Sequence, residues 1–293
     1  MDDAMDQDWP RDYIGYGANP PDPQWPGGAR IAVNFNLNYE CGGEANILDG
    51  DDASEGMLND IGFPPVPGKR NPLAESAFEY GSRVGVWRVL RIFEEFDVKM
   101  SVLGVATALE RNPEATRAFV EGGHEIVSHG LRWIDYHFIG EAEERSHIHQ
   151  AVERIQKVAG VTRRLLVEHG GFHYDRDALN DELPYWVTIA GLPHLVIPYS
   201  YETNDNRCDQ SNGFAQADDF FQYMRDAFDL LHEEGADSPR LLSIGLHDRL
   251  IGRPARAVGL IKLLDHMQSM GDVWFCTGAE IAAHWRKTHP YPA

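Results

Sequence analysis

Cysteine is scarce in this chain, and the cysteines present do not form a pattern that would pair. The 293 residues include three, Cys41, Cys208 and Cys276. An odd number at such wide spacing excludes a disulfide scaffold and a zinc knuckle, because both need closely spaced cysteines. The acidic segment Met1–Asp6 predicts that no signal peptide is present. We therefore expect a reducing, cytoplasmic setting.

Long hydrophobic runs and basic residues are also few. No apolar stretch approaches the roughly 20 residues that a membrane-spanning helix requires. Lysine and arginine total 26 against 46 acidic residues, which gives a formal net charge of -20. This charge argues against nucleic acid or an anionic membrane surface as a partner, although solubility alone explains it equally well. It is compatible with a neutral or cationic small substrate.

Short apolar runs alternate with amphipathic segments along the whole chain. Strands are predicted at residues 31–37, 98–103, 125–128, 194–198, 241–246 and 273–275, and helices at 82–96, 113–122, 141–159, 162–169, 217–234, 254–269 and 278–289. This alternation predicts an α/β fold with a mostly parallel sheet. We expect one domain over residues 1–293: a deformed or incomplete (β/α) barrel of about seven strands, preceded by an extended, proline-rich arm at residues 1–29.

Two histidines stand directly after predicted strands, His129 in the segment SHGLRW and His247 in IGLHD. In a parallel barrel, the residues that follow each strand converge on one face. One such histidine is often a satisfied loop residue, but two together favour function. With Glu40 after the first strand they make a minimal acid–base set. Glu44 is an alternative to Glu40, and Cys41 is a second candidate nucleophile, although a small buried thiol is the commoner role.

Several longer segments are distinctive enough to compare with a known family. They cover nearly the whole chain: residues 11–17 (RDYIGYG), 37–40 (LNYE), 79–83 (EYGSR), 128–136 (SHGLRWIDY), 181–186, 193–199, 203–205 and 242–256. Together they resemble the polysaccharide deacetylase (NodB-type) superfamily, and more closely its metal-independent allantoinase branch. The resemblance implies a deformed (β/α) barrel that hydrolyses a non-peptide C–N bond.

The same resemblance bears on whether a metal is used. Metal-dependent members carry two adjacent aspartates at the end of the first strand, a base and a metal ligand, and two metal histidines four residues apart. The matching positions here are Asn36, Leu37, His129 and Trp133. Leucine and tryptophan cannot ligate a divalent ion, and a single remaining ligand is too few for a catalytic zinc site. The resemblance therefore implies a hydrolase without a metal or other cofactor.

The implied substrate is a small neutral ureide, allantoin, whose ring opens to give allantoate. Glu40 is expected to activate water and His247 to protonate the departing nitrogen, while His129 and Arg132 orient the carbonyl or stabilise its oxyanion. Arg83 is equally well explained as part of a helix start. The expected substrate-binding residues are polar or aromatic: Asn38, Arg83, Arg132, Trp133, Tyr136, Trp186, Asn204 and Asp205.

Two other functions stay open, together with one departure from the family pattern. The alternatives are deacetylation of an N-acetylated sugar polymer and binding of a ureide without turnover.

Relatives carry about 14 additional residues before the helix predicted at 162–169, and this segment is longer than a typical loop. One explanation is that this protein has lost a barrel strand near residues 160–162. The other is that a disordered stretch between these residues is missing from the given sequence; a distance far above 3.80 Å between consecutive Cα atoms there would indicate this second explanation. The aromatic residues of the arm favour packing in a homo-oligomer.

Overall fold

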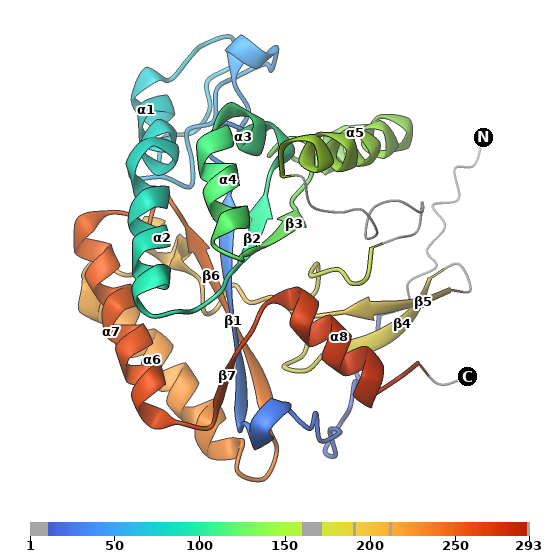
Figure 1. Cartoon of the computed structure of the whole chain (residues 1–293). Helices are drawn as coiled ribbons and strands as arrows, with labels where there is room; N and C mark the ends of the chain where they lie inside the picture. Colours follow the sequence, from blue (N-terminus) through green and yellow to red (C-terminus); the bar gives the residue numbers. More distant parts are fainter. Residues whose placement is uncertain (1–10, 160–171, 190–191, 211–212, 292–293) are drawn as a thin grey trace.

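Parallel strands surrounded by helices form the body of the molecule (Figure 1). The computed structural model describes residues 11–159, 172–189, 192–210 and 213–291. The predicted helix at 162–169 and the questioned junction near 160–162 lie outside these residues. The strands are β1 (Ile31–Tyr39), β2 (Ser101–Gly104), β3 (Glu125–Ser128), β4 (Tyr185–Ile189), β5 (Leu192–Val196), β6 (Arg240–His247) and β7 (Val273–Phe275). The helices are α1 (Pro72–Tyr80), α2 (Val86–Glu95), α3 (Ala106–Arg111), α4 (Pro113–Glu121), α5 (Glu141–Ala159), α6 (Ala217–Glu234), α7 (Pro254–Met270) and α8 (Gly278–Thr288).

One parallel sheet carries most of the strands, in the order β3-β2-β1-β6, with β7 paired to the beginning of β1. β4 and β5 form a separate antiparallel hairpin. Loops, not a strand, bond to the outer edge of β6: Leu241 and Gly245 donate their N–H groups to the carbonyls of Glu182 and Thr203, both at 2.9 Å. This is the deformed (β/α) barrel that the alternation predicts, with one seam closed by loops.

Strand β1 separates the two sides of the barrel wall. Its odd-numbered residues are apolar and join the core beneath the helices, as Phe35 and Leu37 do. Its even-numbered residues Asn34, Asn36 and Asn38 are buried on the inner side, where their amides bond to neighbouring strands. Successive side chains of a strand point to opposite faces, so this alternation gives the barrel an apolar exterior and a polar interior.

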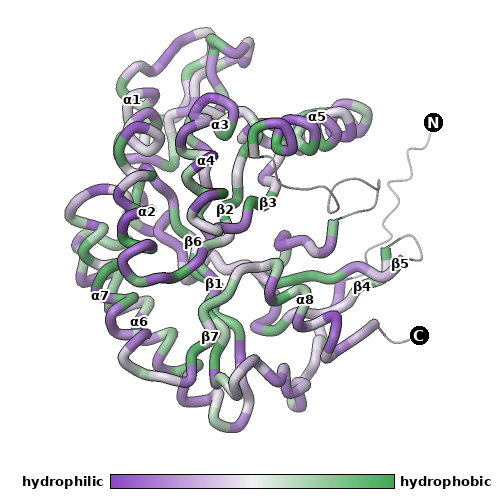
Figure 2. Tube along the Cα trace, viewed as in Figure 1, coloured by the Kyte–Doolittle hydropathy of each residue, from purple (hydrophilic) through white to green (hydrophobic). Residues whose placement is uncertain are grey.

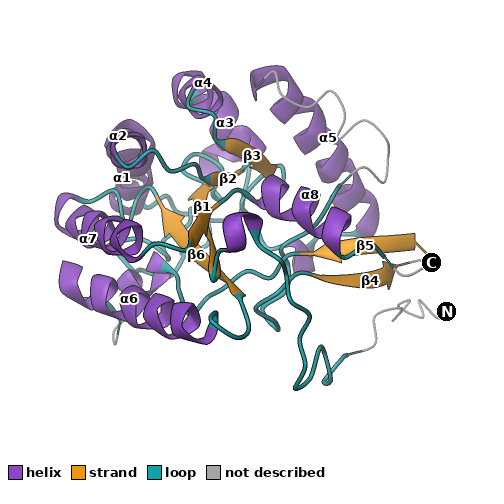
Figure 3. Ribbon diagram, turned by 60° about the horizontal axis from the view of Figure 1, so that its bottom comes forward, coloured by secondary structure: helices purple, strands orange, loops and turns teal. Residues whose placement is uncertain are grey.

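The helices lie around the strands on several sides. Figure 3 places α2, α6 and α7 on one side and α3, α4 and α5 on another, with the β4–β5 hairpin beside α8. Along α6 and α7, hydrophobic and hydrophilic residues alternate (Figure 2), as expected for helices with one buried face. Among the described residues, no helix is both long and apolar enough to cross a membrane.

The structure differs from the predicted elements at a few places. The helix expected at 82–96 begins at Pro72, because the Asn71 side chain accepts the Ala74 N–H and caps it. It then passes through a π-helical turn at Gly81–Gly85 into α2, so Ser82 is not a cap. Helix α3 and strand β4 were not predicted: α3 is short, whereas β4 (YWVTI) consists of residues with high strand propensity, a signal that the prediction missed.

Candidate active site

Three strand ends bring the predicted acid–base residues together. Glu40 follows β1, His129 follows β3 and His247 ends β6. These strands are parallel, and His247 is the register partner of Asn38 on β1. Because the carboxyl ends of parallel strands lie at one edge of a sheet, the three side chains meet at the same end of the barrel.

The Glu40 carboxylate is the centre of this cluster. One oxygen, Oε1, lies 3.2 Å from His129 Nε2. The other, Oε2, lies 3.8 Å from His247 Nε2 and accepts a hydrogen bond of 2.7 Å from Arg249 Nη1. Glu40 and His247 are 3% exposed, whereas the His129 side chain is 35% exposed. Solvent and substrate therefore reach this group from the side of His129.

Arg249 is held rigidly over the carboxylate. Its guanidinium lies 5.1 Å from the ring centroids of both Phe78 and Trp133, and its Nε donates to the carbonyl of Leu58 at 2.7 Å. Aromatic faces stabilise a cation at this distance. The sequence places Arg249 with His247 at the end of the same strand but assigns it no specific role in the site.

The charge on Glu40 is set by these neighbours. Burial opposes ionisation, but the Arg249 guanidinium, with the two histidines, holds the pKa of Glu40 well below its usual range. Glu40 is therefore a carboxylate throughout the neutral pH range. A base with so low a pKa accepts a proton poorly, so Glu40 is better suited to orient water than to deprotonate it.

His247 has the partner that a proton-transferring histidine needs. Its Nδ1 lies 2.6 Å from Asp205 Oδ1, and Asp205 Oδ2 accepts the backbone N–H groups of His247 and Ile251 at 2.8 and 3.1 Å. Asp205 is fully buried. A carboxylate at Nδ1 favours a hydrogen on that nitrogen, and Nε2 faces Glu40. Asp205, predicted to bind substrate, instead orients the histidine.

Of the other predicted binding residues, four lie at the cluster. Asn38 and Asn204 line the polar interior next to it, and both donate to the hydroxyl of Tyr199. Trp133 packs on Arg249. The Tyr136 hydroxyl lies beside Gly130, the neighbour of His129, since a Cβ built on that glycine would be 3.3 Å from it.

Arg132 lies near the cluster, but its guanidinium is already engaged. Asp51 receives two bonds from it, at 2.8 and 2.5 Å, and the Glu44 carbonyl receives a third. This pairing anchors the 45–55 loop to the segment after β3. A guanidinium held in this way is not free to stabilise an oxyanion beside His129.

Two predicted binding residues lie away from the cluster. Arg83 is on the π-helical turn, with a side chain 76% exposed and paired with Glu79. Trp186 is on β4, where its Nε1 donates to the carbonyl of His289 and its ring packs against Tyr291. No local pattern indicates the long-range contact that places β4 next to the C-terminal end of the chain.

The alternative nucleophile and base are also accounted for. The Cys41 thiol donates to Asp248 Oδ1 at 3.1 Å, and burial raises its pKa well above the ordinary value. It is therefore a neutral, inert thiol. The Glu44 carboxylate accepts the N–H of Gly42 at 2.6 Å, within its own turn, so it does not replace Glu40.

A metal ion of the kind the superfamily implies does not fit this site. The described residues contain no group of three histidine, cysteine, aspartate or glutamate side chains that could hold one. Leu37 belongs to the core beneath the helices and Asn36 bonds to Ser243, so neither lies beside His129. The guanidinium of Arg249, packed on Trp133, provides the positive charge next to Glu40.

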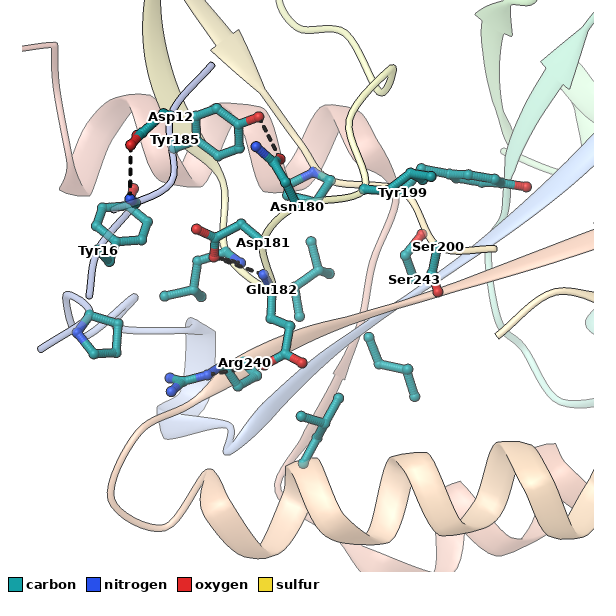
Figure 4. Close-up of a pocket in the computed structure, with 18 of the residues that line it drawn as sticks. Asp12, Tyr16, Asn180, Asp181, Glu182, Tyr185, Tyr199, Ser200, Arg240 and Ser243 are labelled. Atoms are coloured by element: carbon teal, nitrogen blue, oxygen red, sulfur yellow. Dashed lines mark hydrogen bonds and ion pairs between the residues drawn. The ribbon is translucent and has the colours of Figure 1, made fainter. Parts of the chain in front are cut away.

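A large cavity of about 1390 Å³ lies elsewhere, between the N-terminal arm, residues 179–188 and the outer edge of β6 (Figure 4). Glu40, His129 and His247 are not among its lining residues. The chemistry is at the strand ends, and we place the active site there. The Tyr199 ring extends from this cavity away from Asp181 and Glu182 (Figure 4).

Comparison with known proteins agrees with this architecture. Residues 69–183 match the family described as Polysaccharide deacetylase. A "putative polysaccharide deacetylase" of Schizosaccharomyces pombe is 39% identical, over 97% of this chain and 99% of its own length. The crystal structure of a "probable polysaccharide deacetylase" from Pseudomonas aeruginosa PAO1 is 50% identical, with a TM-score of 0.93, over 97% of this chain and 100% of that one. The crystal structure of Puue allantoinase is 51% identical, also with a TM-score of 0.93, over 97% and 99%. The chain therefore belongs to the polysaccharide deacetylase family of hydrolases.

Proposed function

We propose that this protein hydrolyses the ring amide of a cyclic ureide, with allantoin as substrate and allantoate as product, without a metal ion. Water adds to the ring carbonyl carbon, the C–N bond breaks, and the ring nitrogen takes a proton. The new carboxylic acid ionises, so each ring opened releases one proton to solvent.

The residues of the cluster divide this work among them. Glu40 accepts a hydrogen bond from the attacking water, and His247 Nε2 takes the proton of that water and returns it to the departing nitrogen. Asp205 orients His247 and stabilises its charged form. His129, the accessible member, contacts the substrate from the open side.

One observation carries the proposal: the buried ion pair of Glu40 and Arg249, at 2.7 Å, beside His129. The pair has no net charge, which suits a neutral ring, and its guanidinium supplies the positive charge that a metal ion supplies in metal-dependent hydrolases. The 51% identity to Puue allantoinase supports the choice of allantoin.

The test measures allantoate formation by one protein preparation with and without metal. Protein treated with EDTA and protein supplied with zinc are each incubated with allantoin, and allantoate is followed against a His247→Gln variant as inactive control. We expect equal turnover from both wild-type samples and a loss of about 10²–10⁴-fold in the variant.

Other results would separate the alternatives. Turnover abolished by EDTA and restored by zinc would overturn the metal-free mechanism. Acetate released from chitooligomers, without any allantoate, would indicate a polysaccharide deacetylase. Binding of hydantoin without turnover of any ureide would indicate a non-catalytic relative.

A further inference from the structure

The hydroxyl of Tyr199 receives two hydrogen bonds inside the barrel. Tyr199 follows strand β5, and the side-chain amides of Asn38 and Asn204 donate to its oxygen at 2.9 and 3.0 Å. Asn204 lies in the same loop as Tyr199, five residues further along, whereas Asn38 is 161 residues away on β1. Their convergence on one oxygen indicates that the position of this hydroxyl is fixed.

The direction of both bonds follows from the other partners of the two amides. Asn38 Nδ2 also donates to the carbonyl of Leu246 at 3.1 Å, and Asn204 Oδ1 accepts the N–H of Asn206 at 2.9 Å. Neither amide can be turned over without losing these bonds. The Tyr199 oxygen therefore accepts twice, and among the described residues no acceptor is found for its own hydrogen.

This hydroxyl lies directly beneath the acid–base cluster. Asn38 is on the inner face of β1, two residues before Glu40, which follows the strand, and Asn204 adjoins Asp205, which holds His247. A Cβ built on Gly245, two residues before His247, would lie 2.4 Å from the Tyr199 oxygen. Only glycine at position 245 therefore leaves room for the Tyr199 hydroxyl beside strand β6.

The state of the phenol suits a donor. Burial raises the pKa of Tyr199 above its ordinary value despite the bond from Asn38, so the hydroxyl keeps its hydrogen at neutral pH. Its ring points away from the acidic wall of the neighbouring cavity (Figure 4). Two hydrogen bonds donated by N–H groups to a hydroxyl oxygen polarise the O–H bond and make the hydroxyl a stronger hydrogen-bond donor.

We propose that the Tyr199 hydroxyl donates a hydrogen bond to the carbonyl oxygen of the substrate and stabilises the negative charge that develops there when water adds. The inference rests on the proposed function, because it assigns a catalytic residue to that reaction. No proton leaves the phenol in this step. Tyr199, whose hydroxyl hydrogen has no acceptor among the described residues, thus takes the oxyanion-stabilising role that the sequence predicted for Arg132.

The test reads the hydrogen bond without requiring turnover. Hydantoin labelled with ¹³C at the ring carbonyls is bound to wild type, Tyr199→Phe and Tyr201→Phe, and isotope-edited infrared spectra are recorded. Tyr201, which is 62% exposed and packs edge-on against Tyr199, is the matched control. We expect one carbonyl band to lie at lower frequency in wild type and Tyr201→Phe, and to move up in Tyr199→Phe. With allantoin, Tyr199→Phe should lose about 10²–10³-fold in kcat/KM, with most of the loss in kcat, because the hydrogen bond strengthens as charge develops on the oxygen.

Each outcome decides the matter. Identical carbonyl bands in wild type and Tyr199→Phe, or no binding of hydantoin by wild type, would overturn the inference. If the band moves in Tyr199→Phe while wild type turns over no ureide, the result would support hydrogen-bond donation by Tyr199 and reject the proposed reaction. If Tyr199→Phe does not fold, Gly245→Ala, which displaces the hydroxyl, must raise the same band.

Discussion

Asp248 lies in the chain between His247 and Arg249, which both contact Glu40, yet its own carboxylate has few hydrogen-bond partners. Its Oδ1 accepts the Cys41 thiol at 3.1 Å and the Arg249 N–H at 2.9 Å, whereas Oδ2 is buried and has no hydrogen-bond partner among the described residues. Burial raises the pKa of Asp248 from 3.8 to about 6. The folded protein therefore binds a proton more tightly here than the unfolded chain does.

This difference predicts a specific dependence of stability on pH. Because the folded-state pKa is raised, the stabilising contribution of Asp248 is present below pH 4 and is lost as the pH rises through about 6. Asp248→Asn cannot ionise, so its free energy of unfolding relative to wild type should rise between pH 4 and pH 7 by on the order of 3 kcal/mol. Urea unfolding at both pH values, with the exposed Asp237→Asn as control, measures this change. A constant difference between variant and wild type would contradict it.

Only part of the site could be predicted at the level of single residues. Glu40, His129 and His247 could be predicted because each lies at the carboxyl end of a strand, and the carboxyl ends of parallel strands lie at the same edge of a sheet. Arg83 is away from the cluster, exposed and paired with Glu79 four residues earlier, and Trp186 lines the separate cavity, because its strand packs against the C-terminal end of the chain. Tyr199 was not found as a site residue, since its hydroxyl is positioned by Asn38, which is 161 residues away.

The π-helical turn between α1 and α2 is the element that positions the loop after β6. A Cβ on Gly85 would lie 2.0 Å from the Asp248 carbonyl oxygen, and one on Gly81 would lie 2.6 Å from Cys41 Sγ. The helix backbone therefore touches the backbone that leads into Arg249. Such turns are frequent at functional sites, where they shift one helical segment relative to the next.

A larger side chain in this turn should disturb the site through the loop. Gly85→Ala is expected to lower the free energy of unfolding by about 1–3 kcal/mol, because the carbonyl of Asp248 must move. The move displaces Arg249 from Glu40, so kcat should fall as well. Val84→Ala, at a 39% exposed position of the same turn, is the control. Unchanged stability and unchanged kcat in Gly85→Ala would show that the contact has no role.

Elements with local signals were predicted well, and those without them were not. Helices α4 and α7 begin at Pro113 and Pro254, and α5 and α6 have the predicted bounds, because caps and amphipathic spacing are local features. The helix before Gly81 was missed because its cap, Asn71, follows a long loop rich in glycine and proline. The β4–β5 hairpin has apolar and β-branched residues on both strands (YWVTI and LPHLV), but it is half-buried and does not alternate between apolar and polar residues, so β4 was missed.

At the scale of the whole molecule, the arm bears on assembly. Trp25 is buried and donates to the Arg240 carbonyl at 3.1 Å, so the end of the arm packs on its own chain. Tyr13 and Ile14, farther out, are 78% and 83% exposed. Neighbouring exposed apolar side chains are typical of an interaction surface.

We accordingly expect a homo-oligomer that buries the outer arm. Sedimentation equilibrium should give a mass that is a multiple of the single-chain mass, and Ile14→Asp should shift the distribution towards monomer because it places a charge in the contact. Val258→Asp, an exposed apolar position on α7 away from the arm and its cavity, is the control. A monomeric wild type would contradict this expectation.

The loop-closed seam along β6 has a consequence for how this scaffold changes over evolution. A barrel sealed by a strand ladder tolerates few insertions, since every added residue shifts a register. Here carbonyls of Glu182 and Thr203 complete that edge from irregular backbone. Thr203 adjoins Asn204 and Asp205, which hold Tyr199 and His247, whereas Glu182 lines the separate cavity. Segments of different length can therefore be exchanged beside Glu182, while the stretch beside Thr203 has to keep its length for His247 to keep its position.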